Sequence, residues 1–125
     1  PKGMYDILMR IHREYPLVPA IYVTENGIGL KESLPEGATP QTVVDDPKRI
    51  SYLTKYLNAI SDAIRDGANV KGYFIWSLQD QFSWTNGYSK RYGLFFVDFK
   101  TQARYVKSSA EWFKRVSETH VIPER

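Results

Sequence analysis

The chain has 125 residues, of which 42% are hydrophobic and 25% are charged, and its formal net charge is only +3. This size and composition are typical of one globular domain with a buried core. The charged residues are scattered rather than gathered in blocks, so the sequence favours neither a nucleic-acid nor a membrane partner. The absence of cysteine excludes disulfides and thiolate metal sites, and fits the reducing environment of the cytoplasm.

The first part of the chain predicts a helix, a strand and a long loop. Apolar residues recur at helical spacing from Met4 to Ile11, and the pattern ends at residues 14–16. The apolar run 20–23 predicts a buried strand. Residues 30–46 contain prolines, a glycine and small polar residues, which predicts a long excursion loop.

The second part predicts a helix, a strand, a short strand or hairpin, and a last helix. A helix is predicted to begin after Asp46, its N-cap, with a proline at the first helical position. Apolar residues then recur at steps of three and four, and the helix is predicted to end at Gly67. Residues 70–78 predict a strand, and residues 92–99 a third apolar run rich in strand formers. Residues 108–111 resemble a capping box. This alternation of helix and strand predicts a parallel α/β fold.

Two core strands alone cannot close a barrel or form a well-covered open sheet, because parallel strands are normally buried on both faces. We therefore expect residues 1–125 to be the C-terminal part of a single (β/α)8 barrel domain, a fold that usually has about 250 residues. Uncovered strand edges and helix faces would favour self-association of the chain.

Polar and aromatic residues follow both predicted core strands. The first strand leads into Glu25, and the second leads into a cluster between Trp76 and Tyr92. The carboxyl ends of parallel barrel strands meet on one side, so the two groups are expected to share one site. A carboxylate there suits a nucleophile, a metal ligand or a structural partner of an arginine, and composition alone favours the structural role.

The segment Thr24–Gly27 resembles the T-E-N-G nucleophile motif of family 1 glycoside hydrolases, the retaining β-glycosidases built on (β/α)8 barrels. Residues 72–78, 80–84 and 87–94 resemble the final strand and the sugar-binding loop of that family in order and spacing. The likeness extends over nearly the whole chain. It implies a TIM-barrel glycosidase that uses no cofactor and no metal.

The resemblance implies a role for several residues. Glu25 would be the nucleophile, kept ionised by hydrogen bonds and nearby cations. A retaining glycosidase also needs a second carboxyl group about 5–5.5 Å away to protonate the leaving oxygen. Trp76 and Trp84 would bind the sugar ring through their flat faces. The alternative that either tryptophan is plain core stays open.

The chain departs from the common family pattern beside the second tryptophan, where sugar-binding members carry a glutamate and this chain has Ser83. Ser83, Lys90 and Tyr92 match the phosphate-binding residues of 6-phospho-β-glycosidases, since a lysine and hydroxyl groups suit phosphate oxygens. Trp84 favours the branch that acts on 6-phospho-β-galactosides such as lactose 6-phosphate. The expected partner is therefore a phosphorylated disaccharide. Lys90 as an ordinary solvated lysine is the alternative.

Other elements of the family pattern are absent or structural. The chain lacks the N-E-P motif that carries the acid/base glutamate, so alone it is expected to be inactive. Asp80 and Arg91 are expected to have structural roles, Arg91 through an ion pair with a carboxylate. His12 and His120 lie far from the strand ends and are expected on the surface or on helix faces.

Three other functions are weighed against this one. A 6-phospho-β-glucosidase, or an enzyme of dual specificity, would use the same chemistry. A non-catalytic association module would use the uncovered edges of the barrel piece. The hypothesis of nucleotide binding has little support, because neither a G-x-G-x-x-G nor a P-loop motif lies between a strand and a helix.

Overall fold

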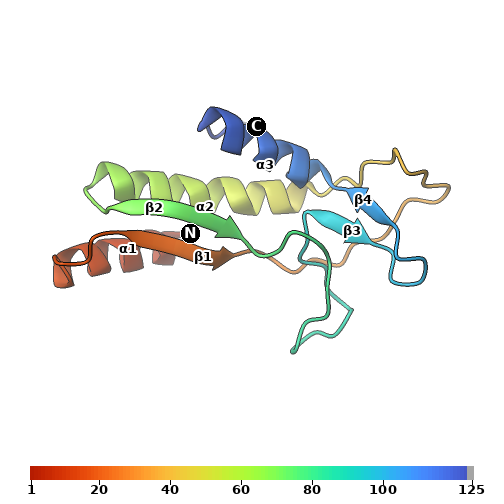
Figure 1. Ribbon diagram of the computed structural model, residues 1–125, viewed down its shortest axis with the longest axis horizontal. Helices are drawn as coiled ribbons and strands as arrows, with labels where there is room; N and C mark the ends of the chain where they lie inside the picture. Colours follow the sequence, from red (N-terminus) through yellow and green to blue (C-terminus); the bar gives the residue numbers. More distant parts are fainter. Residues whose placement is uncertain (124–125) are drawn as a thin grey trace.

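The computed structural model describes residues 1–123, and within that range it contains three α-helices and two small β-sheets (Figure 1). In chain order the elements are α1 (Lys2–Glu14), β1 (Ile21–Asn26), α2 (Pro47–Arg65), β2 (Val70–Ile75), β3 (Phe95–Val97), β4 (Arg104–Val106) and α3 (Ser108–Thr119). β1 pairs in parallel with β2, and β3 pairs antiparallel with β4. The predicted alternation of helix and strand is confirmed. No helix in this range is both long and apolar enough to cross a membrane.

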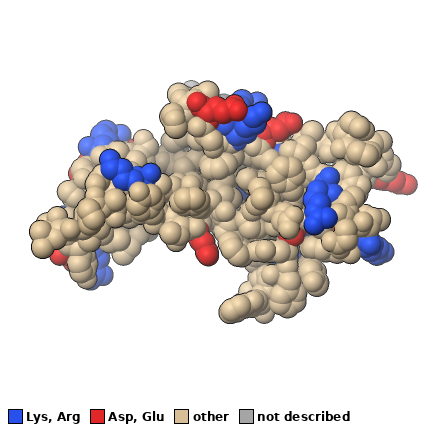
Figure 2. Space-filling view, in the orientation of Figure 1, with Lys and Arg blue, Asp and Glu red and all other residues tan. Residues whose placement is uncertain are grey.

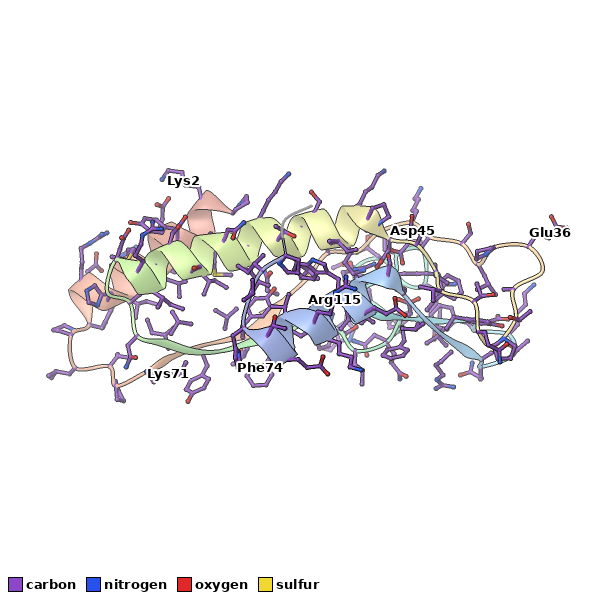
Figure 3. All side chains as sticks on the ribbon, turned by 90° about the horizontal axis from the view of Figure 1, so that it is seen from above. Lys2, Glu36, Asp45, Lys71, Phe74 and Arg115 are labelled. Carbon is purple, nitrogen blue, oxygen red and sulfur yellow. The ribbon has the colours of Figure 1, made fainter. Side chains whose placement is uncertain are left out.

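The β1–β2 sheet is covered on one face only. α1 and α2 lie on that face (Figure 3) and enclose a core made of Leu8, Met9, Val23, Ile60, Ala63 and Ala68. Burial of each of the four larger side chains, Leu8, Met9, Val23 and Ile60, contributes about 1.5–3 kcal/mol to stability. Tyr22 is 57% exposed and Phe74 is 58% exposed, and Phe74 projects from the opposite face (Figure 3). The sheet therefore has a buried outer face and an aromatic, uncovered inner face.

β1 runs further than the predicted strand at 20–23, because its pairing with β2 continues to Asn26. Val23 pairs with Tyr73 and Asn26 pairs with Ile75, so β1 holds one residue more than β2 between these pairs. This extra residue is a β-bulge that includes Thr24 and Glu25. Glu25 thus lies within the strand rather than after it.

β2 is shorter than the predicted strand at 70–78, because the last bond to β1 is from the Trp76 amide to the Asn26 carbonyl, at 2.9 Å, and the backbone then bonds to another segment. The Ser77 amide donates to the Tyr92 carbonyl at 3.1 Å, and the Leu94 amide donates to the Ser77 carbonyl at 2.9 Å. Only residues 95–97 of the predicted run at 92–99 form a strand, which pairs with β4 as a hairpin. The three residues of β4 are too few for an alternating pattern to reveal.

The predicted capping box at residues 108–111 is wrong. Ser108 is the first residue of α3, and the side chain of the N-cap, Lys107, makes no capping bond. The Asp46 carboxylate accepts instead from the Ser109 amide at 2.8 Å and from its hydroxyl at 2.6 Å. Asp46 is the N-cap of α2, as predicted, but its side chain does not cap that helix. It joins the starts of two helices.

The predicted excursion at 30–46 has neither helix nor strand, yet both of its ends are fixed. Leu30 forms an isolated antiparallel bridge with Arg91, and Val44 forms a parallel bridge with Lys107. Glu36 lies near the far end of the excursion (Figure 3). The space-filling view shows lysine and arginine side chains dispersed over one face of the molecule, without a continuous basic patch there (Figure 2).

Candidate active site

A cavity of about 490 Å³ opens at the carboxyl ends of β1 and β2. It is lined by Glu25, Trp76, Gln81, Phe82, Ser83, Trp84 and Tyr92. Most of these residues belong to the segment that projects beyond β2 (Figure 1), here called the site loop, residues 77–92. The structure therefore brings the predicted nucleophile, both tryptophans and both hydroxyl residues to one cavity. Lys90 is not among the lining residues, and Gln81 and Phe82 were not predicted to be there.

The bulge in β1 directs Glu25 toward this cavity. Val23 packs in the core beneath the helices, and the Asn26 side chain also faces that layer. In a regular strand residues two apart share a face, so Val23 and Glu25 would both face the helices. Because of the extra residue in the bulge, Val23 and Glu25 do not share a face, and Glu25 is exposed on the cavity side.

Two tyrosines hold Asn26 on the side of the sheet away from the cavity. The Tyr73 hydroxyl donates to Asn26 Oδ1 at 2.8 Å, and Asn26 Nδ2 donates to the Tyr52 oxygen at 3.2 Å. Burial, followed by a hydrogen bond with Tyr56, raises the pKa of Tyr52 to about 12. Burial also raises the pKa of Tyr73. Both phenols stay neutral at physiological pH, so the network holds the residue after Glu25 without adding charge.

Two glycines allow the strand end to approach the rest of the site closely. A Cβ on Gly27 would lie 1.8 Å from the carbonyl oxygen of Trp76, and a Cβ on Gly29 would lie 2.5 Å from the Tyr92 ring. Any larger residue at either position would push the backbone away from its neighbour. The glycine of the T-E-N-G segment therefore holds the Glu25 strand against Trp76.

The tip of the site loop is a closed turn. The backbones of Ser83 and Gly87 exchange hydrogen bonds of 2.9 and 2.7 Å. Asn86 links the two predicted phosphate-binding hydroxyls: its amide donates to Ser83 Oγ at 3.3 Å and its Nδ2 donates to the Tyr92 hydroxyl at 2.8 Å. No sequence pattern pointed to Asn86, because its contribution depends on how the loop folds back.

Both tryptophans are accessible to a ligand. Trp84 is 96% exposed at the tip of the loop, and Trp76 is 42% exposed at the end of β2. Within residues 1–123 neither tryptophan is buried, so this part of the protein does not support the alternative in which either is plain core. Contact of their indole faces with a sugar stays a prediction.

Two charged side chains near the cavity lack partners within residues 1–123. Neither the Glu25 carboxylate nor the Lys90 ammonium makes a hydrogen bond or ion pair there, although Lys90 is half-buried. The predicted hydrogen bonds and cations that would keep Glu25 ionised are thus not supplied by this part of the protein. No cluster of His, Asp and Glu side chains suited to a metal ion occurs in the described range.

Asp80 and Arg91 have the structural roles that the sequence predicted. Arg91 Nη1 lies 2.9 Å from Asp80 Oδ2, and the buried Asp80 also accepts from the Gly93 amide at 2.9 Å. His120 is the left-handed C-cap residue of α3, and His12 packs beside Gly67. The histidines therefore lie outside the cavity.

A larger hollow, about 600 Å³, lies between α1 and α2 and is lined mostly by charged residues of both signs. It contains none of the residues predicted for catalysis and lies away from the strand ends. Volume alone does not identify a site, and the convergence of a free carboxylate, indoles and hydroxyls favours the smaller cavity.

Comparisons with known proteins identify the family of this chain. Residues 1–122 match the model of glycosyl hydrolase family 1. The chain is 82% identical over 124 residues to a 6-phospho-beta-galactosidase of Lacticaseibacillus casei and 59% identical over 122 residues to one of Staphylococcus haemolyticus. These two matches include 99% and 98% of this chain, but only 26% and 25% of the length of the respective relatives.

The structure is also similar to a family 1 β-glucosidase of Thermotoga maritima, with a TM-score of 0.91 and 40% identity, over 99% of this chain and 27% of that one. The predicted fold class, the C-terminal part of a (β/α)8 barrel, is confirmed, and residues 1–123 do not form a closed barrel. The match of the family model over nearly the whole chain shows that this chain belongs to glycosyl hydrolase family 1.

Proposed function

We propose that residues 1–125 are part of a single barrel domain of a retaining β-glycosidase that hydrolyses 6-phospho-β-D-galactosides, such as lactose 6-phosphate. The observation that carries this proposal is the shared cavity: the Glu25 carboxylate and the hydroxyl residues Ser83 and Tyr92 line one wall of the same space. Relatives named 6-phospho-beta-galactosidase, at up to 82% identity, support the substrate class.

Glu25 acts as the nucleophile in this proposal. Its carboxylate attacks the anomeric carbon while the bond to the leaving oxygen breaks, and a covalent glycosyl-enzyme forms. An acid outside this chain protonates the leaving oxygen, and water then releases the sugar with retained configuration. The exposed carboxylate, turned to the cavity by the bulge, is suited to this attack.

Ser83, Lys90 and Tyr92 bind the 6-phosphate, while Trp76 and Trp84 contact the sugar. Lys90 does not line the cavity, but its ammonium is free of protein partners within residues 1–123. An unpaired, half-buried cation is suited to a phosphate. Trp84 favours galactosides, and 6-phospho-β-glucosides are the alternative or additional substrates.

The test uses a complete barrel, here called the hybrid enzyme, in which this chain replaces the matching segment of the Lacticaseibacillus casei relative. Rates are compared on nitrophenyl β-galactoside with and without a 6-phosphate, and on the 6-phosphoglucoside. We expect a strong preference for the phosphorylated galactoside. Equal rates with and without phosphate would refute the phosphate site, and equal rates on the two phosphorylated sugars would establish dual specificity.

Lys90→Ala in the hybrid enzyme separates phosphate binding from surface charge. Loss of a charge-assisted contact should raise the KM for the phosphorylated substrate about tenfold or more, and leave the unphosphorylated substrate unaffected. Lys114→Ala, an exposed lysine on α3, is the matched control. A small and equal effect on both substrates would show that Lys90 is an ordinary surface residue.

The isolated chain is proposed to be inactive and to associate through its uncovered sheet face. Tyr22, Phe74 and Trp76 are each more than two-fifths exposed there, an apolar surface that favours association. This surface is the observation that favours the association module as a second function. Size-exclusion chromatography with a hydrophobic dye tests it, and a monomer that binds no dye would contradict it.

A further inference from the structure

Six buried or half-buried charged side chains form a continuous series of ion pairs behind the site loop. We call this series the charge chain. In spatial order its members are Asp46, Arg49, Glu32, Lys107, Asp80 and Arg91. Acid and base alternate along it, so every charge has a partner of opposite sign. Buried side-chain nitrogen and oxygen atoms in residues 1–123 all have hydrogen-bond partners.

Glu32 stands at the centre of the charge chain and holds two cations at once. Its Oε1 lies 2.7 Å from Arg49 Nη2, and its Oε2 lies 2.6 Å from Lys107 Nζ. Its side chain is 9% exposed, and those of Arg49 and Lys107 are 2% and 0% exposed. Removing the Glu32 charge would leave two buried cations short of a counter-charge, which is costly.

One branch of the charge chain bonds to the backbone on both sides of the cavity. Arg49 Nη1 donates to the carbonyl of Ile28 at 2.5 Å and to that of Tyr92 at 3.3 Å. Arg49 Nη2 donates to the carbonyl of Arg91 at 3.0 Å. Ile28 follows Glu25 closely in sequence, and Tyr92 lines the cavity. Arg49 therefore fixes the nucleophile strand relative to the end of the site loop.

The other branch ends at Arg91, between Lys90 and Tyr92. Lys107 bonds to Asp80 Oδ1 at 2.9 Å, and Arg91 bonds to Asp80 Oδ2 at 2.9 Å. The Arg91 guanidinium also lies 3.8 Å from the centre of the Phe96 ring. These contacts hold the Arg91 side chain on the buried side of the segment.

Arg91 lies between Lys90 and Tyr92, so its placement also fixes the backbone of both neighbours. Its backbone pairs with Leu30 through hydrogen bonds of 2.8 and 3.0 Å, and the chain bends at Lys90 immediately before it. Tyr92 lines the cavity, whereas Lys90 does not. A shift of Arg91 would therefore move both of the neighbouring residues that are proposed to bind the phosphate.

We propose that the charge chain is a positioning device, centred on Glu32, that holds Lys90 and Tyr92 toward the substrate phosphate relative to Glu25. This inference rests on the proposed function for the identity of the ligand. None of its six members lines the cavity, so each acts through the residues it positions. It also gives the excursion at residues 30–46 a role, because Glu32 lies near one of its ends and Asp46 lies at the other.

The test compares Glu32→Gln with Glu36→Gln in the hybrid enzyme. Both variants remove one carboxylate charge from the same excursion, but Glu36 is exposed and lies near the far end of the excursion (Figure 3). Arg91→Lys is a second variant that keeps the charge and loses the flat guanidinium, in case Glu32→Gln does not fold. KM and kcat are measured for the galactoside with and without phosphate, together with hydrogen exchange of the site-loop amides.

Glu32→Gln and Arg91→Lys should raise the KM for the phosphorylated substrate about tenfold, with little change for the unphosphorylated one. Site-loop amides should exchange faster, while those of β1 and β2 should not. Glu36→Gln should match the unsubstituted enzyme. Equal loss of kcat on both substrates, faster exchange everywhere, or no change at all would overturn the proposal.

The kinetic constants and the hydrogen exchange test this inference and the proposed function separately. If the unsubstituted hybrid enzyme shows no preference for the phosphorylated substrate, the proposed function fails. Site-loop exchange then decides the positioning role alone: faster exchange confined to residues 77–92 would support it, and unchanged exchange would refute it.

Discussion

The two sides of the site loop differ in how fully their side chains are bonded. On the cavity side, Trp84 is 96% exposed and the Glu25 carboxylate has no partner within residues 1–123. On the other side, Asp80 is 3% exposed and accepts bonds from a lysine, an arginine and backbone amides. Groups that meet a substrate must keep free bonding capacity, whereas groups that position them are held by saturated contacts.

This contrast makes opposite predictions for the two sides. Changes on the cavity side should alter catalysis and leave stability almost intact. Changes on the buried side should lower stability and, through position, the affinity for phosphate. Substitutions in the hybrid enzyme test this contrast, and those that remove a catalytic group should have the strongest effects.

Glu25→Ala should lower kcat by about 10⁴-fold or more, the scale seen when a catalytic residue is removed. The melting temperature should not fall, because the carboxylate is exposed. Azide should restore turnover, since a small anion can occupy the space of the lost carboxylate and attack the anomeric carbon. Glu36→Ala is the control with no expected effect. A Glu25→Ala enzyme of ordinary activity would contradict the assignment.

Arg49→Met should lower the free energy of unfolding by about 3–5 kcal/mol, the cost of breaking a buried ion pair from one side. It leaves the Asp46 carboxylate and three backbone carbonyls without their donor. Arg65→Met removes an exposed ion pair with Asp62 and should cost less than about 1 kcal/mol. Urea denaturation compares the two. Equal effects would show that the charge chain is no more important than a surface pair.

Gly27→Ala should lower the free energy of unfolding by about 1–3 kcal/mol. It should also reduce kcat, so this one substitution should change both stability and catalysis. Its Cβ would meet the Trp76 carbonyl at 1.8 Å, and the shift needed to relieve this moves the neighbouring Glu25. At Gly3 in α1 a Cβ meets nothing within 4 Å, so Gly3→Ala should be neutral or slightly stabilising. Full activity in Gly27→Ala would refute the close fit.

Tyr52→Phe should lower the free energy of unfolding by about 1 kcal/mol, because the hydrogen bond with Asn26 is lost. Tyr15 is exposed, so Tyr15→Phe should leave the free energy of unfolding unchanged. The folded pKa of Tyr52 is raised from its usual 10.0 to about 12, so its stabilising effect is complete below pH 10 and is lost as the pH rises toward 12. The stability difference between the unsubstituted enzyme and Tyr52→Phe should therefore narrow above pH 10. A difference that stays constant to pH 12 would contradict this.

The sequence was sufficient to predict the order of elements and a cavity at the ends of the two parallel strands. Helical spacing located α1 and α2, and the polar residues at the two strand ends indicated a common cavity that the structure contains. These predictions succeeded because they depend on local periodicity and on a general property of parallel strands. The assignment of Ser83 and Tyr92 came from the family resemblance rather than from spacing.

Features that depend on pairing between distant segments were not predictable. The bulge at Glu25 is a relation between β1 and β2, and neither strand alone reveals which of them holds the extra residue. The charge chain joins Glu32 to Lys107, which are 75 positions apart. The Asp46 carboxylate likewise caps a helix that starts 62 positions later, whereas the local pattern at residues 108–111 indicated a capping box that does not form.

The most direct measurement of the central claim is covalent labelling of the hybrid enzyme with a 2-deoxy-2-fluoro-β-galactoside carrying a good leaving group, with and without a 6-phosphate. The fluorine slows hydrolysis of the glycosyl-enzyme, so the labelled peptide can be mapped by mass spectrometry. We expect the phosphorylated reagent to label Glu25 much faster than the unphosphorylated one. Labelling of another carboxylate, or equal rates with both reagents, would contradict it.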